Sequence, residues 1–509
     1  MARSRRPHPT SAQCQSAIAR LLAQGHLDEA RRHVKAHLRL APADPWLLNE
    51  AGRLSRRAGD LAEAERCYRR LLAQNPCDAG ALNGLGLTRY DGDDLVAAEQ
   101  LYRQALQHVP AYSACHNNLA VLLHRCDRHQ EAIAAYRAAL QHDPHYHAAR
   151  YGLATVLAHA GELAAAEACV RTYLQAYPHD TRAQTTLGMV LLQQGRFGEG
   201  WPLYRARYAA DNPQRFVTLP DWPVPYWQGQ SLQGRTLLVL CEQGFGDALQ
   251  FARYLCRIKD EHGAARVLLV CREPLRTLLA TLANVDAVLV TAPRDALPPF
   301  DAWCMLLDVP AHFVESATPF APCPPYLRVP EPVSTSLRLP EDRHRPGAKR
   351  MRVGLVWRGA AAHLNDRHRS LHGLDDLAPL LGRTDIQWVS LQKGAGEDDA
   401  RTAARQGKLL ALGHTLHGFA DTAAVVAQLD LVITVDTAVA HLAGAMDVPC
   451  WVMLPALARD WRWLEGQTRS PWYPRMQLFP RGATESWREV VARMARQLPA
   501  SAAPSSTAQ

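Results

Sequence analysis

An acidic residue at the end of an apolar run is the first candidate for chemistry in this chain. Residues 431–435 (LVITV) are β-branched and apolar, which predicts a strand buried on both faces of a parallel sheet. Asp436 and Thr437 follow the run, and a helical pattern of small residues begins at Ala438, with His441 one turn further on. Unpaired N–H groups at such a helix start suit a diphosphate. The alternative is that Asp436 only caps the helix and His441 only packs.

A second carboxylate stands in an equivalent place. Residues 236–241 (TLLVLC) predict another buried strand, followed by Glu-Gln-Gly-Phe-Gly-Asp and a helical run from 248 to 259. This loop contains Gly244, Gly246 and Asp247. A strand-end carboxylate flanked by glycines is accessible to a substrate hydroxyl, and general-base help is worth about 10²- to 10⁴-fold in rate. The alternative is that Asp247 is the cap of its own helix.

Other predicted strands are also followed by residues that suit a ligand. These strands span 352–357, 386–391 and 450–454. An arginine there can bind phosphate through two parallel hydrogen bonds, and an aromatic ring can cover a base or a sugar. For the arginines and lysine the alternative is a solvated loop charge, and for the tryptophans it is core packing. The candidates are Trp357, Arg367, Arg369, Lys393, Trp461, Arg462 and Trp463.

The elements that must position these residues form two consecutive α/β blocks. Residues 211–335 form the first block, with further strands at 267–271, 287–290 and 303–307 and a helix near 274–282. Residues 336–350, in a stretch rich in Pro, Arg and Ser, are predicted to link it to the second block, 351–497. Strands alternating with helices predict two doubly wound sheets, with ligands where the carboxyl ends of the strands face a cleft.

Residues 11–210 carry a repeat with a period of 34 residues. Prolines, alanines and tyrosines keep one register, a small residue recurs between them, and Gly or Asp stands at each turn. This is the helix-turn-helix pattern of the tetratricopeptide family, in which small residues let paired helices touch and Pro ends the second helix. We predict five full repeats and a partial sixth. The register residues are Pro42, Pro76, Pro110, Pro144, Pro178, Ala30, Ala64, Ala98, Ala132, Ala166, Tyr68, Tyr102 and Tyr136.

The concave face of such an array offers a candidate binding site. Asn49, Asn83 and Asn117 share one register position, and a ladder of amides there could hold the backbone of an extended peptide. The alternative is that Asn is simply tolerated on an exposed helix.

Composition narrows the class of protein. The 509 residues carry a net charge of +8 without a basic cluster rich in aromatics, so nucleic-acid binding is not expected. We expect no membrane span and no signal peptide, because no sufficiently long apolar stretch occurs. The 12 cysteines form no C-x-x-C pair, which argues against a zinc site or a disulfide framework and favours a cytoplasmic location. Residues 1–10 and 498–509 are predicted to be disordered.

The motifs EQGFGD, NDRHRS, SLQKG, VDTAVAHLAGA, DWRW and SPWYP together carry a resemblance. The chain resembles bacterial proteins that join tetratricopeptide repeats to a heptosyltransferase-like glycosyltransferase domain. That resemblance implies a GT-B module of two Rossmann-like halves, the first on the acceptor side and the second on the nucleotide-sugar donor side. It implies that Asp247 is the general base, and that Asp436, Thr437 and His441 lie at the donor diphosphate. Arg367 or Arg369 is the nearest match to the family's donor-loop lysine.

The resemblance implies a glycosyltransferase that moves a sugar from a nucleotide diphosphate to an acceptor hydroxyl, with the repeats recruiting a protein acceptor or partner. No D-x-D triad ends a strand, so we expect a metal-independent mechanism without a further cofactor. Two alternatives stay open. The chain is a non-catalytic repeat scaffold with a degenerate transferase domain, or its acceptor is a glycan or lipid-linked saccharide.

Overall fold

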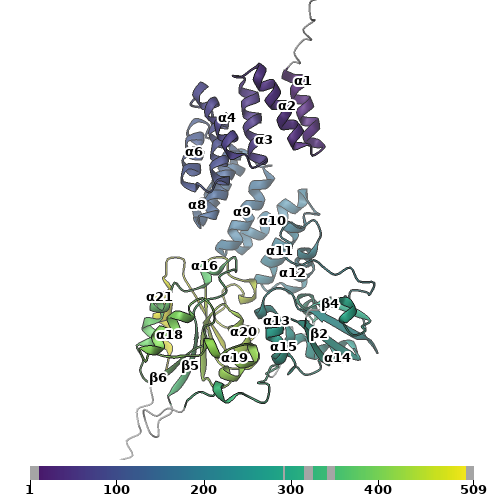
Figure 1. Ribbon diagram of the computed structural model, residues 1–509, viewed down its shortest axis with the longest axis vertical. Helices are drawn as coiled ribbons and strands as arrows, with labels where there is room; N and C mark the ends of the chain where they lie inside the picture. The colour runs from purple at the N-terminus through teal and green to yellow at the C-terminus, as the bar shows by residue number, and fades with distance from the viewer. Residues whose placement is uncertain (1–10, 291–292, 314–324, 341–349, 500–509) are drawn as a thin grey trace, which may run out of the picture. The chain divides into compact units, whose positions relative to one another are not determined.

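The computed structural model describes residues 11–290, 293–313, 325–340 and 350–499 (Figure 1). The predicted disordered ends, apart from residues 498–499, and most of the predicted linker lie outside these ranges. The described chain forms two compact units. The first runs to Leu157 and includes Ala164–Ala176, and the second comprises Ala158–Leu163 and the chain from Tyr177 onward.

The first unit is an array of paired antiparallel helices, as the repeat pattern predicts. Each second helix ends two residues before one of the register prolines, because Pro cannot continue it. The helices are α1 (Ser11–Ala23), α2 (Leu27–Leu40), α3 (Pro45–Arg57), α4 (Leu61–Gln74), α5 (Ala79–Asp91), α6 (Leu95–His108), α7 (Ser113–Arg125), α8 (His129–His142), α9 (His147–Ala160) and α10 (Leu163–Ala176).

The register residues pack as their sizes require. The five register alanines are fully buried. The ring of Tyr68 fills the space left by two glycines: a Cβ on Gly52 would come within 2.8 Å of it, and one on Gly84 within 2.4 Å. The turn positions also agree, since Asp93 and Asp127 adopt the same left-handed backbone (φ 65° and 59°) as the glycines of the other turns.

The partial sixth repeat belongs to the second unit. It consists of α11 (Thr181–Gln193), α12 (Phe197–Tyr204) and the 3₁₀ helix η1 (Arg205–Tyr208). Leu192, Phe197, Trp201 and Tyr204 share one apolar core with the α/β region that follows. The helices of this sixth repeat therefore pack as part of the α/β core.

A four-stranded parallel sheet comes next, in the order β3-β2-β1-β4. The strands occupy the predicted positions, and the predicted helix from 248 to 259 is divided by a 3₁₀ turn, η2 (Ala252–Tyr254). Its elements are β1 (Thr236–Leu240), α13 (Phe245–Phe251), α14 (Leu255–His262), β2 (Arg266–Cys271), α15 (Glu273–Leu279), β3 (Ala287–Val290), β4 (Ala302–Met305) and η4 (Leu306–Phe313).

A six-stranded parallel sheet, β10-β9-β8-β5-β6-β7, completes the second unit (Figure 1). Numbered from its own first strand, the order is 3-2-1-4-5-6, as in doubly wound nucleotide-binding folds. The elements are β5 (Met351–Val356), α16 (Asp366–Arg369), η6 (Leu374–Leu377), α17 (Ala378–Leu381), β6 (Ile386–Ser390), α18 (Glu397–Arg405), β7 (Leu410–Ala411), α19 (Phe419–Val426), β8 (Leu431–Val435), α20 (Ala438–Ala445), β9 (Cys450–Leu454), η8 (Trp461–Trp463), β10 (Met476–Pro480) and α21 (Trp487–Gln497).

The predicted α/β class is confirmed for the C-terminal part of the chain: both sheets are wholly parallel. Among the described residues, no helix is both long and apolar enough to cross a membrane.

Candidate functional site

Both strand-end carboxylates lie where the winding of a sheet reverses. Asp247 follows β1, which pairs with β2 on one side and β4 on the other. Asp436 follows β8, whose neighbour β5 is the first strand of its own sheet. In open parallel sheets this reversal leaves a crevice at the carboxyl ends of the strands, and ligands bind there.

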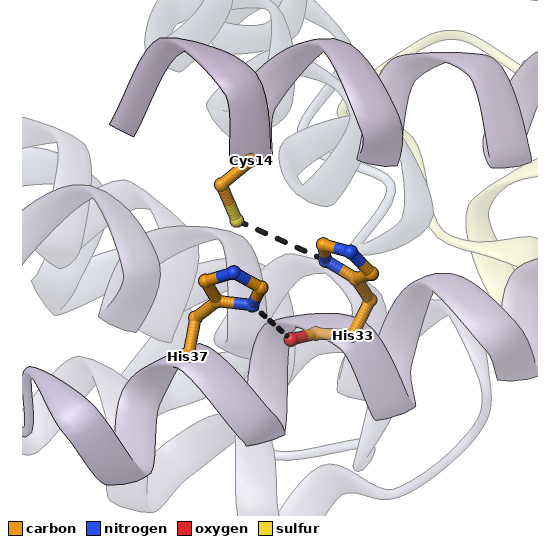
Figure 2. A group of neighbouring side chains, drawn as sticks. All are labelled: Cys14, His33 and His37. Carbon is orange, nitrogen blue, oxygen red and sulfur yellow. Dashed lines mark hydrogen bonds between the residues drawn. The ribbon is translucent and has the colours of Figure 1, made fainter. Parts of the chain in front are cut away.

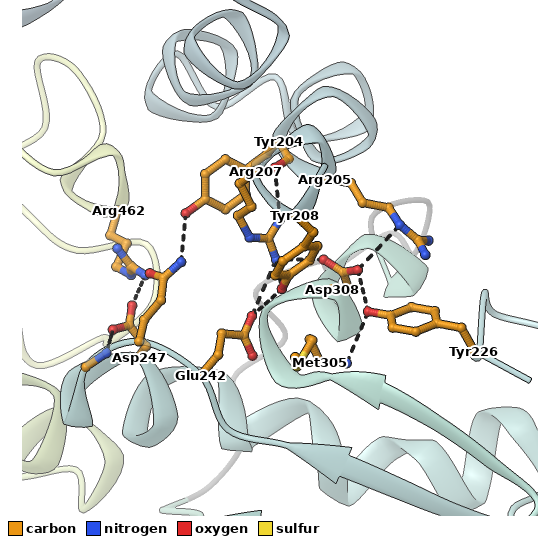
Figure 3. Close-up of polar contacts among 12 residues, drawn as sticks. Tyr204, Arg205, Arg207, Tyr208, Tyr226, Glu242, Asp247, Met305, Asp308 and Arg462 are labelled. Carbon is orange, nitrogen blue, oxygen red and sulfur yellow. Dashed lines mark hydrogen bonds and ion pairs between the residues drawn. The ribbon is translucent and has the colours of Figure 1, made fainter. Parts of the chain in front are cut away.

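Asp247 does cap its helix, but the cap uses only part of the carboxylate. Its Oδ2 accepts a hydrogen bond of 2.6 Å from the backbone N–H of Gly244, closing the first turn of α13. Its Oδ1 forms an ion pair with the guanidinium of Arg462, which comes from η8 in the other α/β half (Figure 3). The side chain stays 15% exposed. Asp247 therefore connects the two halves and keeps solvent access.

Arg462 is the centre of this polar cluster. Its Nη1 lies 2.8 Å from both carboxylate oxygens of Asp460, while Nη2 contacts Asp247. The guanidinium packs over the rings of Trp461, at 4.7 Å, and Phe251, at 5.3 Å. A planar cation with several fixed donors can hold two carboxylates at once, which a lysine could not do with this geometry.

Asp460 brings Asp436 into the same cluster. Burial, and then the nearby Asp460 carboxylate, raise the pKa of Asp436 to about 6. The Arg369 guanidinium acts in the opposite direction, and its Nη1 donates a 3.1 Å hydrogen bond to the backbone carbonyl of Asp436. Asp247 thus pairs directly with Arg462, and Asp436 lies near enough to Asp460 and Arg462 for their charges to act on its pKa.

The start of α20 is packed closely against α13. A Cβ on Gly246 would lie 2.9 Å from the ring of His441, so only glycine fits at this position. His441 is buried, its Nδ1 lies 3.2 Å from the hydroxyl of Tyr473, and its ring stacks on Trp463. Burial lowers the pKa of His441 to about 3, so this ring is neutral at ordinary pH. Its position favours the packing alternative over contact with a ligand.

Thr437 leaves the first amides of α20 uncapped. Its hydroxyl lies 2.9 Å from that of Thr434, and its side chain makes no capping hydrogen bond. Ala438 begins the helix next to Gly246 and is partly exposed. The helix start therefore keeps the unpaired donors that would suit an anion.

The predicted basic residues differ in position. Arg369 lies against Asp436, as described above, and pairs with Asp366 at 3.5 Å. Arg367 is exposed and contacts the ring of His368. Lys393 donates a 3.0 Å hydrogen bond to the carbonyl of Gly413. Of these three residues, Arg369 is the one that contacts the Asp436 loop.

The candidate tryptophans all lie in the core, as the packing alternative predicts. Trp357 and Trp463 are fully buried, and Trp461 is 5% exposed among the rings of Trp201, Tyr204 and Phe251. None of these rings is available to cover a ligand. The reason is packing, because each ring belongs to an apolar core cluster of the α/β region.

Sequence reasoning missed a buried polar network behind the Gly-rich loop (Figure 3). Arg207 of η1 donates to Asp308 at 2.7 Å and lies 3.5 Å from Glu242, the first residue of that loop. Glu242 also accepts a 2.5 Å hydrogen bond from the Tyr208 hydroxyl. The conspicuous signal was the Glu of EQGFGD itself, which directly follows a buried strand.

One cation therefore faces two carboxylates inside the protein. Burial raises the pKa of Glu242 to about 7, although Arg207 and the Tyr208 hydroxyl act in the opposite direction. The Tyr226 hydroxyl donates a 2.7 Å hydrogen bond to Asp308. The network attaches the loop that carries Asp247 to the last repeat helix and to η4.

The asparagine ladder of the repeats is only partly available. Asn49 is exposed and Asn117 is half-buried, whereas Asn83 is buried and its amide oxygen accepts a 2.9 Å hydrogen bond from Asn118. Asn83 is thus used within the array, because neighbouring repeats bring Asn118 against it.

Comparison with known proteins identifies the repeats. Residues 49–113 and 127–190 match models of the tetratricopeptide repeat. This chain carries tetratricopeptide repeats. The predicted helix-turn-helix period is thereby confirmed.

The chain is also similar to Protein FlbA of Caulobacter vibrioides, with 29% identity over 328 residues, which are 60% of this chain and 52% of FlbA. It thus spans about half the length of that curated relative. A solved tetratricopeptide protein of Thermus thermophilus is 21% identical over 36% of this chain and 100% of its own, with a TM-score of 0.33. Pseudomonas aeruginosa PilF is 16% identical over 40% of this chain and 93% of its own, with a TM-score of 0.36.

Proposed function

We propose that the second unit is a GT-B glycosyltransferase that uses a nucleotide-diphosphate sugar. The observation that carries the proposal is the contact between the two switch points: Asp247 pairs with Arg462 of the second half, and Gly246 packs against Ala438 and His441 at the start of α20. Two doubly wound sheets whose ligand-binding edges meet are suited to hold a donor on one side and an acceptor on the other.

The second sheet is proposed to hold the donor. The free amides at the start of α20 and the guanidinium of Arg369 supply positive charge beside Asp436. As the bond between the sugar and the diphosphate breaks, negative charge develops on the leaving nucleoside diphosphate, and these groups stabilise it. In this mechanism amides and arginine perform the role that a divalent ion has in other transferases.

The first half is proposed to bind the acceptor near Asp247. Its carboxylate accepts the proton of the acceptor hydroxyl while that oxygen bonds to the sugar carbon and the diphosphate leaves. Gly244 and Arg462 hold the carboxylate in place, and the partial exposure of the side chain leaves room for the hydroxyl.

The repeats are proposed to recruit a protein, as the acceptor or as a partner. The exposed Asn49 and half-buried Asn117 support a peptide contact, and the charged residues Arg53 and Arg56 stand on the same helix as Asn49.

The test measures transfer or hydrolysis of nucleotide sugars by the full chain and by two variants. Asp247→Asn keeps an acceptor for the Gly244 N–H but removes the base, so we expect a rate about 10²- to 10⁴-fold lower. Asp436→Asn should also lower the rate, because the resemblance places Asp436 at the donor, where a carboxylate can accept hydrogen bonds from sugar hydroxyls. Asp260→Asn, an exposed acid on α14, is the matched control. Full turnover by both site variants would disprove the residue roles.

The scaffold alternative makes a different prediction for the same protein. A repeat scaffold with a degenerate transferase domain would show no turnover and no stabilisation by any nucleoside diphosphate or nucleotide sugar. Binding without turnover would favour a missing acceptor, and assays with peptides, glycans and lipid-linked saccharides would then distinguish the acceptor classes.

A further inference from the structure

Three potential metal ligands converge at the beginning of the repeat array (Figure 2). Cys14 lies on α1, and His33 and His37 lie one turn apart on α2. Residues at positions i and i+4 share one face of a helix, so both rings point toward the neighbouring α1. The ligand atoms of all three residues lie within 4.8 Å of one another.

The hydrogen bond made by His37 leaves its other ring nitrogen available to bind a metal. His37 donates from Nδ1 to the backbone carbonyl of His33 at 2.8 Å, so its proton is on Nδ1 and its Nε2 keeps a lone pair. Histidines that bind metals characteristically use the second ring nitrogen in this way, which fixes the ring and its tautomer. His33 Nδ1 lies 3.9 Å from the Cys14 sulfur. A metal between them would need only a small contraction, since zinc lies about 2.3 Å from sulfur and about 2.0 Å from nitrogen.

We propose that Cys14, His33 and His37 form a zinc site that joins α1 to α2. One thiolate and two imidazoles are a donor set that Zn²⁺ prefers, and a water molecule would complete four-coordination. The site is independent of the proposed transferase activity. Its expected effect is to hold α1 against α2, since α1 is the outermost described helix of the array and terminal repeats lack a neighbour on one side.

A surface pocket reaches one of the three proposed ligands, His33. The pocket has a volume of about 420 Å³ and is lined by Ala17, Arg20, Leu21, Glu29, Arg32 and His33. Cys14 is buried in the apolar core formed by α1, α2 and α3. A thiol binds zinc as the thiolate, so metal binding at Cys14 releases a proton and should weaken at low pH.

The alternative is a core cysteine that makes a weak S–H···N hydrogen bond to His33, with no role for His37. The two explanations differ in what happens when a metal is added. A site built from all three side chains loses affinity when either His37 or Cys14 is changed. A simple core cysteine gives no thiolate-to-metal signal.

The experiment uses the full chain, freed of metal with a chelator and kept reduced without thiols. Zn²⁺ is titrated in, and Co²⁺ is used as a spectroscopic substitute. The wild type should bind one tight equivalent in this site and show a thiolate-to-cobalt charge-transfer band together with the visible bands of tetrahedral cobalt. Zinc should also raise the temperature at which the helices unfold.

Two variants and two controls locate the signal. Cys14→Ser should abolish the charge-transfer band, and His37→Ala should weaken zinc binding by at least about 10- to 100-fold, the loss that even outer-shell changes cause. Cys77→Ser and His145→Ala change exposed side chains elsewhere in the array and should bind like the wild type. Circular dichroism checks the fold, and if Cys14→Ser fails to fold, the half-buried His37 carries the test.

Either of two results would overturn the proposal. One is a wild type without a thiolate-to-cobalt band. The other is a folded His37→Ala variant that binds zinc and cobalt as the wild type does.

Discussion

At the scale of single residues, two arginines each form ion pairs with two carboxylates. Arg462 joins Asp247 to Asp460, and Arg207 joins Glu242 to Asp308. Removing one member of such a buried group leaves an uncompensated charge, which costs more than the interaction itself contributes. The two groups differ in burial: the Arg462 group has solvent access through Asp247, whereas the Arg207 group is enclosed.

The enclosed group should make stability depend on pH. The folded protein raises the pKa of Glu242 from 4.5 to about 7, so it binds the proton more tightly than the unfolded chain does. The contribution of protonated Glu242 to the free energy of unfolding is therefore fully present below about pH 4.5 and is lost as the pH rises through 7. Its size is about 3 kcal/mol. Relative to wild type, Glu242→Gln should therefore gain about 3 kcal/mol in free energy of unfolding between pH 4 and pH 8.

Tryptophan fluorescence measures this change, since all tryptophans except Trp46 belong to the second unit. Glu273→Gln, which alters an exposed carboxylate on α15, serves as the control. A difference between Glu242→Gln and wild type that stays constant with pH would contradict the assignment of the raised pKa.

At the scale of elements, the repeats hold together by fitting tyrosine rings against glycines. Tyr68 of α4 lies between Gly52 of α3 and Gly84 of α5, so one ring sets the spacing of three helices. The 34-residue period makes this relation readable from sequence, because the contacts are between near neighbours in the chain.

Substitution of Gly84 by Ala should therefore destabilise the array. The added Cβ would come within 2.4 Å of the Tyr68 ring, which is buried and meets Gly52 on its other side. Overpacking costs about 1–3 kcal/mol, more than the gain of up to about 1 kcal/mol in helix propensity. Gly92→Ala is the matched control: its Cβ would meet nothing closer than 3.5 Å, and the equivalent position of the preceding repeat is Ala58. Urea denaturation followed by far-ultraviolet circular dichroism should separate the two variants.

At the scale of the whole molecule, the chain has two compact units, and the proposed function assigns nucleotide binding to the second. A ligand that binds only the folded second unit should stabilise that unit by mass action. We expect a nucleoside diphosphate, at about 100 times its dissociation constant, to add about 2.7 kcal/mol to the unfolding free energy measured by tryptophan fluorescence. Arg369→Gln should reduce this effect, whereas Arg401→Gln, on the exposed face of α18, should leave it unchanged. If the nucleoside diphosphate raised the unfolding free energy equally in both variants, Arg369 would not belong to the donor site.

The sequence by itself determined the repeats, the buried strands β1, β8 and β9, and the two carboxylates that end β1 and β8. These features follow from local periodicity and from short apolar runs, which neighbouring residues specify. Only the tertiary structure decided which side chains meet. Asp247 and Arg462 are 215 residues apart, and their pairing depends on how two sheets pack. The same holds for the burial of Trp357, because distant segments create that environment.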